Sequence, residues 1–219
     1  MTAAAQEGLQ AFTRKWRERW PEWALAEVFV PVPQRETAVA WFALLQEFSD
    51  AAWGGADPAP GLAKLAWWQE ELRGWAKGAR RHPLGEVLQA RSSRWQTLAD
   101  AMGLLRHRDL PADAASAIQA LAPFNAAAAQ VEADLFGGPV GDTAAGLALL
   151  VPAVTGQGDA DNAAGLLQAN DASHAAPRAV RLLRHVLRQR LQQAAEGAAG
   201  RSPSRWRTLW ALWRAARSA

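Results

Sequence analysis

The sequence predicts an all-α fold in one domain that spans residues 1–219. Strand signals are almost absent, because only Val28-Phe29-Val30 has the residue types of a strand, and it runs into Pro31 and Pro33, which would spoil a central strand. The rest of the chain alternates segments of helical period with Gly, Pro and Asp breakers. Half of the residues are hydrophobic, enough for a sizeable core, and many helices joined by short loops favour a single bundle.

Ten helices are expected from this alternation. In chain order they cover residues 3–20, 22–29, 34–53, 60–77, 83–106, 111–136, 141–154, 161–170, 176–196 and 203–217. The glycine-rich junctions between them are interpreted as connections between helices and not as linkers between domains. They lie at 54–55, 137–139, 156–158 and 197–204.

The first and last of these helices are amphipathic. In 3–20, Phe12, Trp16 and Trp20 are spaced by four, with Arg14 and Arg17 opposite. In 203–217, Trp206, Trp210 and Trp213 share one face and are flanked by Arg205, Arg207 and Arg214. Tryptophan can seal a core with arginine lying over it, and this interpretation is preferred. Peripheral membrane contact through the same faces is the alternative.

The helix 34–53 has two distinct faces. Its core stripe is Ala38, Trp41, Phe42, Leu45 and Ala52. Beside that stripe, Gln46, Ser49, Asp50 and Trp53 follow one another at i, i+3, i+4 and i+7, so they share a second face. This second face carries the polar groups on which a functional assignment depends.

The helix 60–77 repeats the arrangement. Leu65, Trp68, Leu72 and Trp75 form an ordinary core stripe. Lys64, Trp67 and Glu71 occupy a second face, again at spacings of three and four. A helix with two such faces either packs between neighbours or lines a cavity.

Composition excludes several classes of protein. The chain has no cysteine, so thiol nucleophiles, disulfides and cysteine-based zinc sites are excluded. The net charge of +3 gives little support to a nucleic-acid partner, and none is expected. No HExxH, P-loop or GxGxxG motif is present. Residues 1–10 do not resemble a secretory signal, and no long apolar run follows, so a soluble, cytoplasmic protein is expected, with membrane association at its surface left open.

Two segments resemble the squalene/phytoene synthase family. The run FVPVPQRETAVAWFALLQEFSDAAW resembles the family's first conserved helix, in which a proline-containing approach and an arginine, here Arg35, precede an apolar stretch and an aspartate-rich motif. The run KLAWWQEELRGWAKGARRHPLGEVL resembles the family's tryptophan-pair signature. Lys64, Trp67, Trp68, Glu71, His82, Pro83 and Leu88 stand at matching positions. The match covers roughly a quarter of the chain.

The resemblance implies a fold and a chemistry. The fold is a helical bundle of the isoprenoid-synthase type around a central apolar cavity. The chemistry is the Mg²⁺-dependent condensation of two prenyl diphosphates with loss of diphosphate. Mg²⁺ is a hard cation that prefers oxygen ligands, so family members present aspartates on two facing helices to bridge the metal to the diphosphates.

The sequence departs from this pattern at the positions that would hold the metal. The first aspartate motif falls on Ser49, Asp50 and Trp53, and only Asp50 is an acid. Gln46 and Gln69 stand where the family has arginines. The second motif has no candidate on a clear helix, since Asp159 and Asp161 lie in a turn-like segment and Asp171 in a cap or loop. One carboxylate on an apolar face is a poor magnesium site.

Three hypotheses therefore stand side by side. The first is a squalene/phytoene synthase-like protein that is impaired in prenyl condensation and acts as a lipid-binding or assembly factor, with an isoprenoid or other lipid as ligand and no cofactor. The second is an active Mg²⁺-dependent prenyltransferase that uses farnesyl or geranylgeranyl diphosphate and builds its site from Glu47, Asp50 and Glu71. The third is a helical interaction module with no ligand. The residues expected to line the substrate site are Gln46, Ser49, Asp50, Trp53, Lys64, Trp67 and Glu71, with Asp50 as the metal ligand and Arg35, Trp68, His82 and Pro83 as structural positions.

Overall fold

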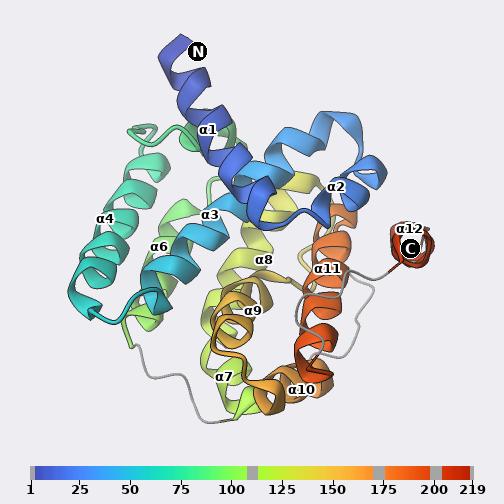
Figure 1. Ribbon diagram of the computed structural model, residues 1–219. Helices are drawn as coiled ribbons and strands as arrows, with labels where there is room; N and C mark the ends of the chain where they lie inside the picture. Colours follow the sequence, from blue (N-terminus) through green and yellow to red (C-terminus); the bar gives the residue numbers. More distant parts are fainter. Residues whose placement is uncertain (1–2, 108–112, 170–175, 198–203, 218–219) are drawn as a thin grey trace.

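The computed structural model describes residues 3–107, 113–169, 176–197 and 204–217, and the regular secondary structure of this part of the chain is entirely helical, with no strand (Figure 1). The all-α prediction is confirmed for these residues. Asp171, a residue considered for the second aspartate motif, lies outside them. The α-helices are α1 (Ala3–Arg19), α2 (Trp23–Ala26), α3 (Arg35–Trp53), α4 (Pro58–Ala76), α5 (Gly85–Leu88), α6 (Trp95–Ala101), α7 (Ala114–Ala120), α8 (Ala122–Phe136), α9 (Ala145–Gln157), α10 (Ala160–Ala169), α11 (Arg178–Ala195) and α12 (Arg205–Arg217). Short 3₁₀ helices are η1 (Glu27–Phe29), η2 (Val32–Gln34), η3 (Gln89–Arg91) and η4 (Met102–Arg106).

Helix α3 is the central element of the bundle. It packs against α1, α4, α5 and α9, and Figure 1 shows α1 lying across it. Every residue from Thr37 to Ala52 is buried except Asp50, which is half-buried. The predicted core stripe is therefore correct, but it covers only part of the buried surface, because α1 covers Gln46 and Asp50 of the polar face and α9 covers Ser49.

The boundaries of the helices follow local chemistry. Asp57 caps α4 by accepting a hydrogen bond from the Ala59 amide at 2.9 Å, and Pro58 takes the first helical position, where no amide hydrogen is needed. Helix α9 ends at Gln157, and the next residue, Gly158, has a φ of +69° in the left-handed region. Asp159 then accepts from the Asn162 amide at 3.0 Å, so this turn-like segment caps α10.

Two predicted helices are interrupted in the structure. The segment 83–106 is divided into α5, η3, α6 and η4, because Ser92 is extended and its hydroxyl accepts from the Arg94 amide at 3.0 Å, a local turn that competes with the helix. The segment 111–136 is divided between α7 and α8 at Leu121. Pro123 lies in the first turn of α8, where its missing amide hydrogen leaves no helical bond unmade.

Aromatic rings fill the space between α3, α4, α6 and α8. The rings form a continuous series in which neighbouring centroids lie 5.0–6.4 Å apart: Trp41, Trp95, Trp75, Trp68, Phe48 and Phe124. Most of these pairs meet edge to face, the geometry that aromatic quadrupoles favour. A second group joins α1 and α2 to α3 through Trp16, Trp20, Trp23 and Phe42.

The tryptophans of the two terminal helices have opposite environments. Trp16 and Trp20 are buried, as core packing requires. Trp206, Trp210 and Trp213 are exposed, so the preferred interpretation holds for α1 and is wrong for α12. Among the described helices, none combines the length and the apolar character needed to cross a bilayer.

Candidate functional site

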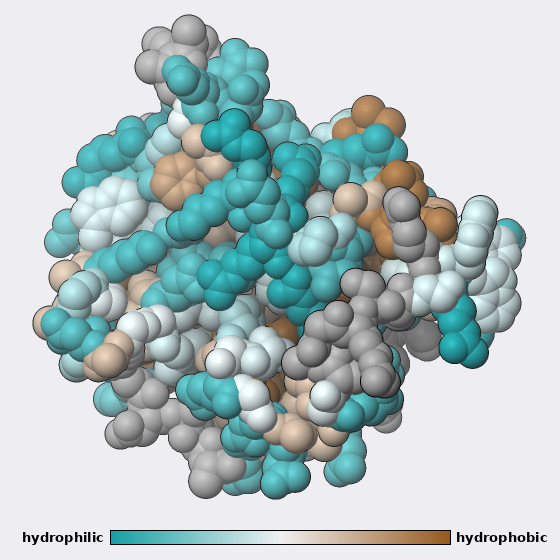
Figure 2. Space-filling view, viewed as in Figure 1, coloured by the Kyte–Doolittle hydropathy of each residue, from teal (hydrophilic) through white to brown (hydrophobic). Residues whose placement is uncertain are grey.

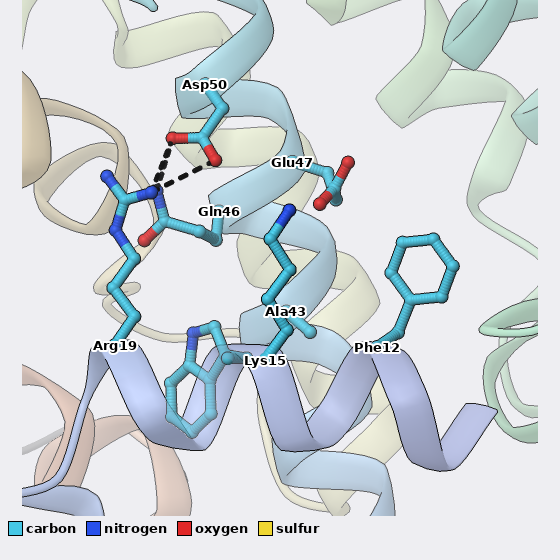
Figure 3. A pocket seen from close by; sticks show the side chains of 8 residues that line it. Phe12, Lys15, Arg19, Ala43, Gln46, Glu47 and Asp50 are labelled. Carbon is cyan, nitrogen blue, oxygen red and sulfur yellow. Dashed lines mark hydrogen bonds and ion pairs between the residues drawn. The ribbon is translucent and has the colours of Figure 1, made fainter. Parts of the chain in front are cut away.

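The candidate site lies where α1 crosses α3. Two matching sets of side chains meet there, each at spacings of i, i+3, i+4 and i+7, the spacing that places residues on one helical face. The pocket is lined by Phe12, Lys15, Trp16 and Arg19 from α1 and by Ala43, Gln46, Glu47 and Asp50 from α3 (Figure 3). Its volume is about 20 Å³, room for about one water molecule.

Asp50 closes one end of the pocket in a chain of hydrogen bonds. Arg19 Nη1 lies 3.1 Å from Asp50 Oδ1 and 3.2 Å from Oδ2. Gln46 donates from Nε2 to Asp50 Oδ1 at 2.9 Å, and Trp20 donates its indole hydrogen to Gln46 Oε1 at 2.9 Å. Figure 3 shows Arg19 reaching up from α1 to this carboxylate. The acid expected to bind a metal is thus neutralised within the chain.

Glu47 is the second acid of the pocket, and it too has a cation. Lys64 from α4 places its Nζ 2.6 Å from Glu47 Oε2. Glu47 is buried, and in Figure 3 the Lys15 side chain points toward it from α1. Cationic side chains from two helices therefore converge on the carboxylates of α3.

The remaining predicted residues of α3 point away from this pocket. Ser49 donates its hydroxyl hydrogen to the Leu149 carbonyl of α9 at 2.7 Å. Trp53 packs against the core. Neither lines the pocket, because α1 covers a face centred between Gln46 and Glu47, about a third of a turn away from Ser49. The predicted face begins at Gln46 and the pocket face at Ala43, so the two differ by a rotation of about 60° around the helix.

Glu71 binds the loop that follows α4. Its buried carboxylate accepts hydrogen bonds from Trp75 Nε1 at 2.8 Å, from the Arg81 amide at 2.7 Å, from Arg81 Nε at 2.9 Å and from the His82 amide at 2.9 Å. Burial alone would raise the pKa of Glu71, but these donors outweigh it and the pKa is lowered. The carboxylate is therefore ionised and fixes the loop.

His82 is held between aromatic rings by this loop. Its ring centroid lies 4.5 Å from that of Phe12 and 4.6 Å from that of Trp68, and its Nδ1 accepts from the Leu84 amide at 3.2 Å. Burial lowers the pKa of His82 to about 4, and Lys64 adds to this, while Glu47 and Glu71 oppose it. The imidazole is neutral at pH 7 and orders the loop.

The other motif positions contact backbone and neighbouring helices. Arg35 donates to the carbonyls of Val30 and Val28 at 3.0 and 3.1 Å, which holds η1 against the start of α3. Pro83 packs against α1 at Gly8, where an added Cβ would lie 2.9 Å from Pro83 Cγ. Trp68 is buried, whereas Trp67 is 36% exposed and Lys64 is half-buried. The second face of α4 is thus open to solvent in part, and only Glu71 of its three residues is buried.

Arg19 and Lys15 are residues of the site that the motif comparison did not identify. The signal was present in the amphipathic pattern of 3–20, since both cations lie three residues after an aromatic residue of the buried stripe. That pattern predicts a packed helix but does not say which helix it packs on. Within the described residues, no group of three or more His, Cys, Asp or Glu side chains is placed to hold a metal ion.

Asp50→Ala is expected to lower the free energy of unfolding by about 1 kcal/mol or less. The pair with Arg19 is partly exposed on both sides, and exposed ion pairs contribute little. Urea unfolding measures the change. Asp100→Ala is the matched control, because Asp100 pairs with Arg73 on an exposed surface at 3.3 Å. A loss several times larger at Asp50 than at Asp100 would contradict this assignment.

Comparison with protein-family models, with curated proteins and with solved structures gives no match to this chain. Any functional assignment therefore depends on the geometry of these residues and on the resemblance of two segments of the chain to the squalene/phytoene synthase family.

Proposed function

We propose that this chain is a squalene/phytoene synthase-like helical protein that does not condense prenyl diphosphates and acts as a lipid-binding or assembly factor. The observation that carries the proposal is the pairing of both pocket carboxylates with cations of the chain itself, Asp50 with Arg19 and Glu47 with Lys64. The family fold, with its central apolar cavity, is part of the same proposal.

The physical argument concerns what a metal would have to displace. Mg²⁺ needs oxygen ligands in octahedral geometry and binds diphosphate through them. At this site it would compete with a guanidinium and an ammonium that already lie 2.6–3.2 Å from the carboxylate oxygens. The pocket between α1 and α3 has room for about one water molecule, far less than a prenyl diphosphate needs. These features oppose condensation chemistry at this site.

The positions that match the family have structural roles in this chain. Trp68 lies in the aromatic series, Glu71 and His82 order the loop after α4, and Arg35 holds η1. A scaffold that retains these contacts while its acids are paired internally is suited to binding and not to catalysis.

A helical interaction module with a filled core is the second candidate. The observation that favours it is the aromatic series between α3, α4, α6 and α8, in which buried rings occupy the interior. The two candidates differ in whether a lipid is bound. The active synthase remains a third alternative, but of its three acids Glu71 is committed to the loop and the other two are paired.

An assay of diphosphate release separates these functions. The protein is incubated with farnesyl or geranylgeranyl diphosphate, with and without Mg²⁺, beside an active prenyl synthase as positive control. We expect no metal-dependent release. The double variant Arg19→Ala/Lys64→Ala, which removes both cations, is expected to stay inactive as well, because removing the cations creates neither a second aspartate set nor space for substrate.

The outcome that overturns the proposal is Mg²⁺-dependent release by the wild type that is lost in Asp50→Ala. Calorimetric titration with farnesyl diphosphate then distinguishes the two inactive functions. Binding without turnover supports a lipid-binding factor, whereas no binding supports the interaction module.

A further inference from the structure

Helix α12 presents tryptophan to solvent on the face opposite its packing contacts. Trp206, Trp210 and Trp213 are 81%, 61% and 43% exposed, and their spacing of four and three residues places them on one face. The buried residues of the helix are Thr208, Leu212 and Ala216, which lie on the other side. Large exposed apolar side chains gathered on one face indicate a surface that another molecule covers.

The orientation of α12 is fixed by its contacts with the bundle. It packs against α11, α2 and η1, and Figure 1 shows it at the periphery beside α11. Gln189 of α11 donates to Thr208 Oγ at 3.1 Å, and Arg181 donates to the Ala215 carbonyl at 3.3 Å. Because these contacts secure the inner face, the tryptophans cannot turn inward without breaking them.

Further apolar surface lies next to α12. Val28, in η1, and Val32, in η2, are both more than half exposed, and η1 contacts α12. Figure 2 shows hydrophobic side chains gathered at the edge of the molecule beside α12. Exposed apolar side chains therefore lie near α12 at η1, in addition to those on its tryptophan face.

Charge along the chain is strongly asymmetric. Residues 177–219 contain ten arginines and one acid, Glu196, a net charge of +9. The preceding residues contain fourteen lysines and arginines against twenty acids, a net charge of −6, and the two parts together give the net +3 of the chain. Such asymmetry indicates an anionic partner for the basic part.

The arginines of α12 lie beside its tryptophans. The Arg214 guanidinium lies 5.0 Å from the Trp210 ring centroid, and that of Arg217 lies 4.7 Å from the Trp213 centroid. Arg207 is exposed and lines a cleft of about 230 Å³ between α11 and α12, together with Arg188 and His185. The surface thus offers indole rings and guanidinium groups side by side.

We propose that α12 lies along the surface of an anionic phospholipid bilayer. Trp206, Trp210 and Trp213 enter the region between head groups and acyl chains, where indole rings are favoured, and Arg207, Arg214 and Arg217 contact lipid phosphates. A nucleic acid would match the charge but would leave the apolar edge at Val28 and Val32 uncovered. The bilayer matches both features. The inference is independent of the loss of catalysis, because α12 contributes no residue to the pocket between α1 and α3.

Co-sedimentation of the full chain with vesicles tests the proposal. Vesicles of phosphatidylcholine alone are compared with vesicles of equal parts phosphatidylcholine and phosphatidylglycerol. We expect binding to the anionic vesicles that weakens as salt rises. Replacing Arg207, Arg214 and Arg217 with glutamine is expected to reduce partitioning about 100-fold, at roughly a five-fold loss for each arginine near an anionic surface.

The variant Trp206→Ala/Trp210→Ala/Trp213→Ala is expected to reduce partitioning at least about ten-fold, since interfacial helices bind through their buried apolar area. The charge control replaces exposed Arg91, Arg94 and Arg106, around α6, with glutamine, and is expected to bind like the wild type. Far-UV circular dichroism confirms that each variant is folded. Wild-type protein that binds neither vesicle, or α12 variants that bind as well as the control, would overturn the proposal.

Discussion

Replacing Glu71 with alanine lowers the free energy of unfolding by about 3 kcal/mol, because a buried donor left without an acceptor costs about 1–3 kcal/mol, whereas the exposed Arg81 side chain can turn to water. The carboxylate accepts four hydrogen bonds from Trp75, Arg81 and His82, and alanine would leave those donors without an acceptor. The Trp75 indole is fully buried and cannot turn to water instead. Urea-induced unfolding followed by circular dichroism measures the loss.

Two further variants separate the carboxylate from its helix position. Glu71→Gln keeps one acceptor oxygen but turns an amide toward the Arg81 guanidinium, so its loss is expected to be smaller than that of alanine. Glu70→Ala is the matched control, because Glu70 is the preceding residue of α4 and is exposed. Its effect is expected to stay within about 0.5 kcal/mol. Equal losses at positions 70 and 71 would show that the helix and not the hydrogen-bond network is responsible.

The same network predicts the direction of an acid effect. The pKa of Glu71 is lowered in the folded protein, so the folded state binds this proton less readily than the unfolded state does. The contribution of Glu71 to the free energy of unfolding is therefore fully present above pH 4.5, the ordinary pKa of a glutamate, and is lost as the pH falls below that value. Glu71→Gln removes the titrating group, and its acid unfolding curve is expected to lack this component.

The sequence predicts helical faces well and their partners poorly. The stripe of Leu65, Trp68, Leu72 and Trp75 is buried as its period requires. Glu71 shares a period with Lys64 and Trp67, yet its environment is set by the amides of Arg81 and His82, which the loop after α4 brings back to the helix. The spacing of residues along a helix does not predict that a following loop will fold back against it.

The tryptophans at α1 and α12 likewise show that sequence patterns do not predict which neighbour a helical face packs against. Both helices space tryptophan by three or four residues and carry arginine nearby. Directly after α1 the ring of Trp20 donates to Gln46 of α3, whereas in α12 the buried positions are the small or aliphatic Thr208, Leu212 and Ala216. Which stripe is buried depends on the surface that the bundle offers. For α12 that surface accommodates small side chains and leaves the indoles outside.

The pocket at α1 and α3 could be predicted in part. Gln46 and Asp50 were identified from the motif, and both line it. Ser49 was assigned to the same face but bonds to α9, because a helix as fully buried as α3 has neighbours on every side and no single polar face. The cations that neutralise the pocket come from α1 and α4, and their approach is a property of tertiary packing.

Glu132→Gln raises the free energy of unfolding by up to about 3 kcal/mol at pH 8 and has little effect near pH 4.5. Glu132 is fully buried on α8, where it accepts the Trp41 indole hydrogen at 3.0 Å. Burial raises its pKa from 4.5 to about 7, and the hydrogen bonds from Trp41 and Thr143 and the charge of Arg184 oppose this only in part. The difference of about 2.5 pH units corresponds to about 3 kcal/mol.

The direction in which stability changes with pH follows from proton binding to Glu132. Between pH 4.5 and 7 the folded state keeps the proton of Glu132 and the unfolded state has lost it, so wild-type stability falls as the pH rises through this window. Glutamine is neutral at every pH, retains an oxygen for Trp41 and lacks this dependence. Urea unfolding of both proteins at pH 5 and pH 8 measures the two slopes. Asp134→Asn, an exposed acid of the same helix, is the control and should leave the slope unchanged.

The stability of Glu132→Gln at pH 8 also shows whether Glu132 is neutral or forms an ion pair with Arg184. The Arg184 guanidinium donates from Nη2 to the Thr143 carbonyl at 2.8 Å, and burial lowers the pKa of Arg184. If Glu132 were instead the ionised partner of this arginine, removing its charge would leave the buried cation with less compensating negative charge, although Asp142 also acts on it, and Glu132→Gln would destabilise the protein. The two arrangements predict opposite signs at pH 8. Stabilisation by glutamine would show that the carboxyl group is held neutral at the centre of the bundle, where its charge would be costly.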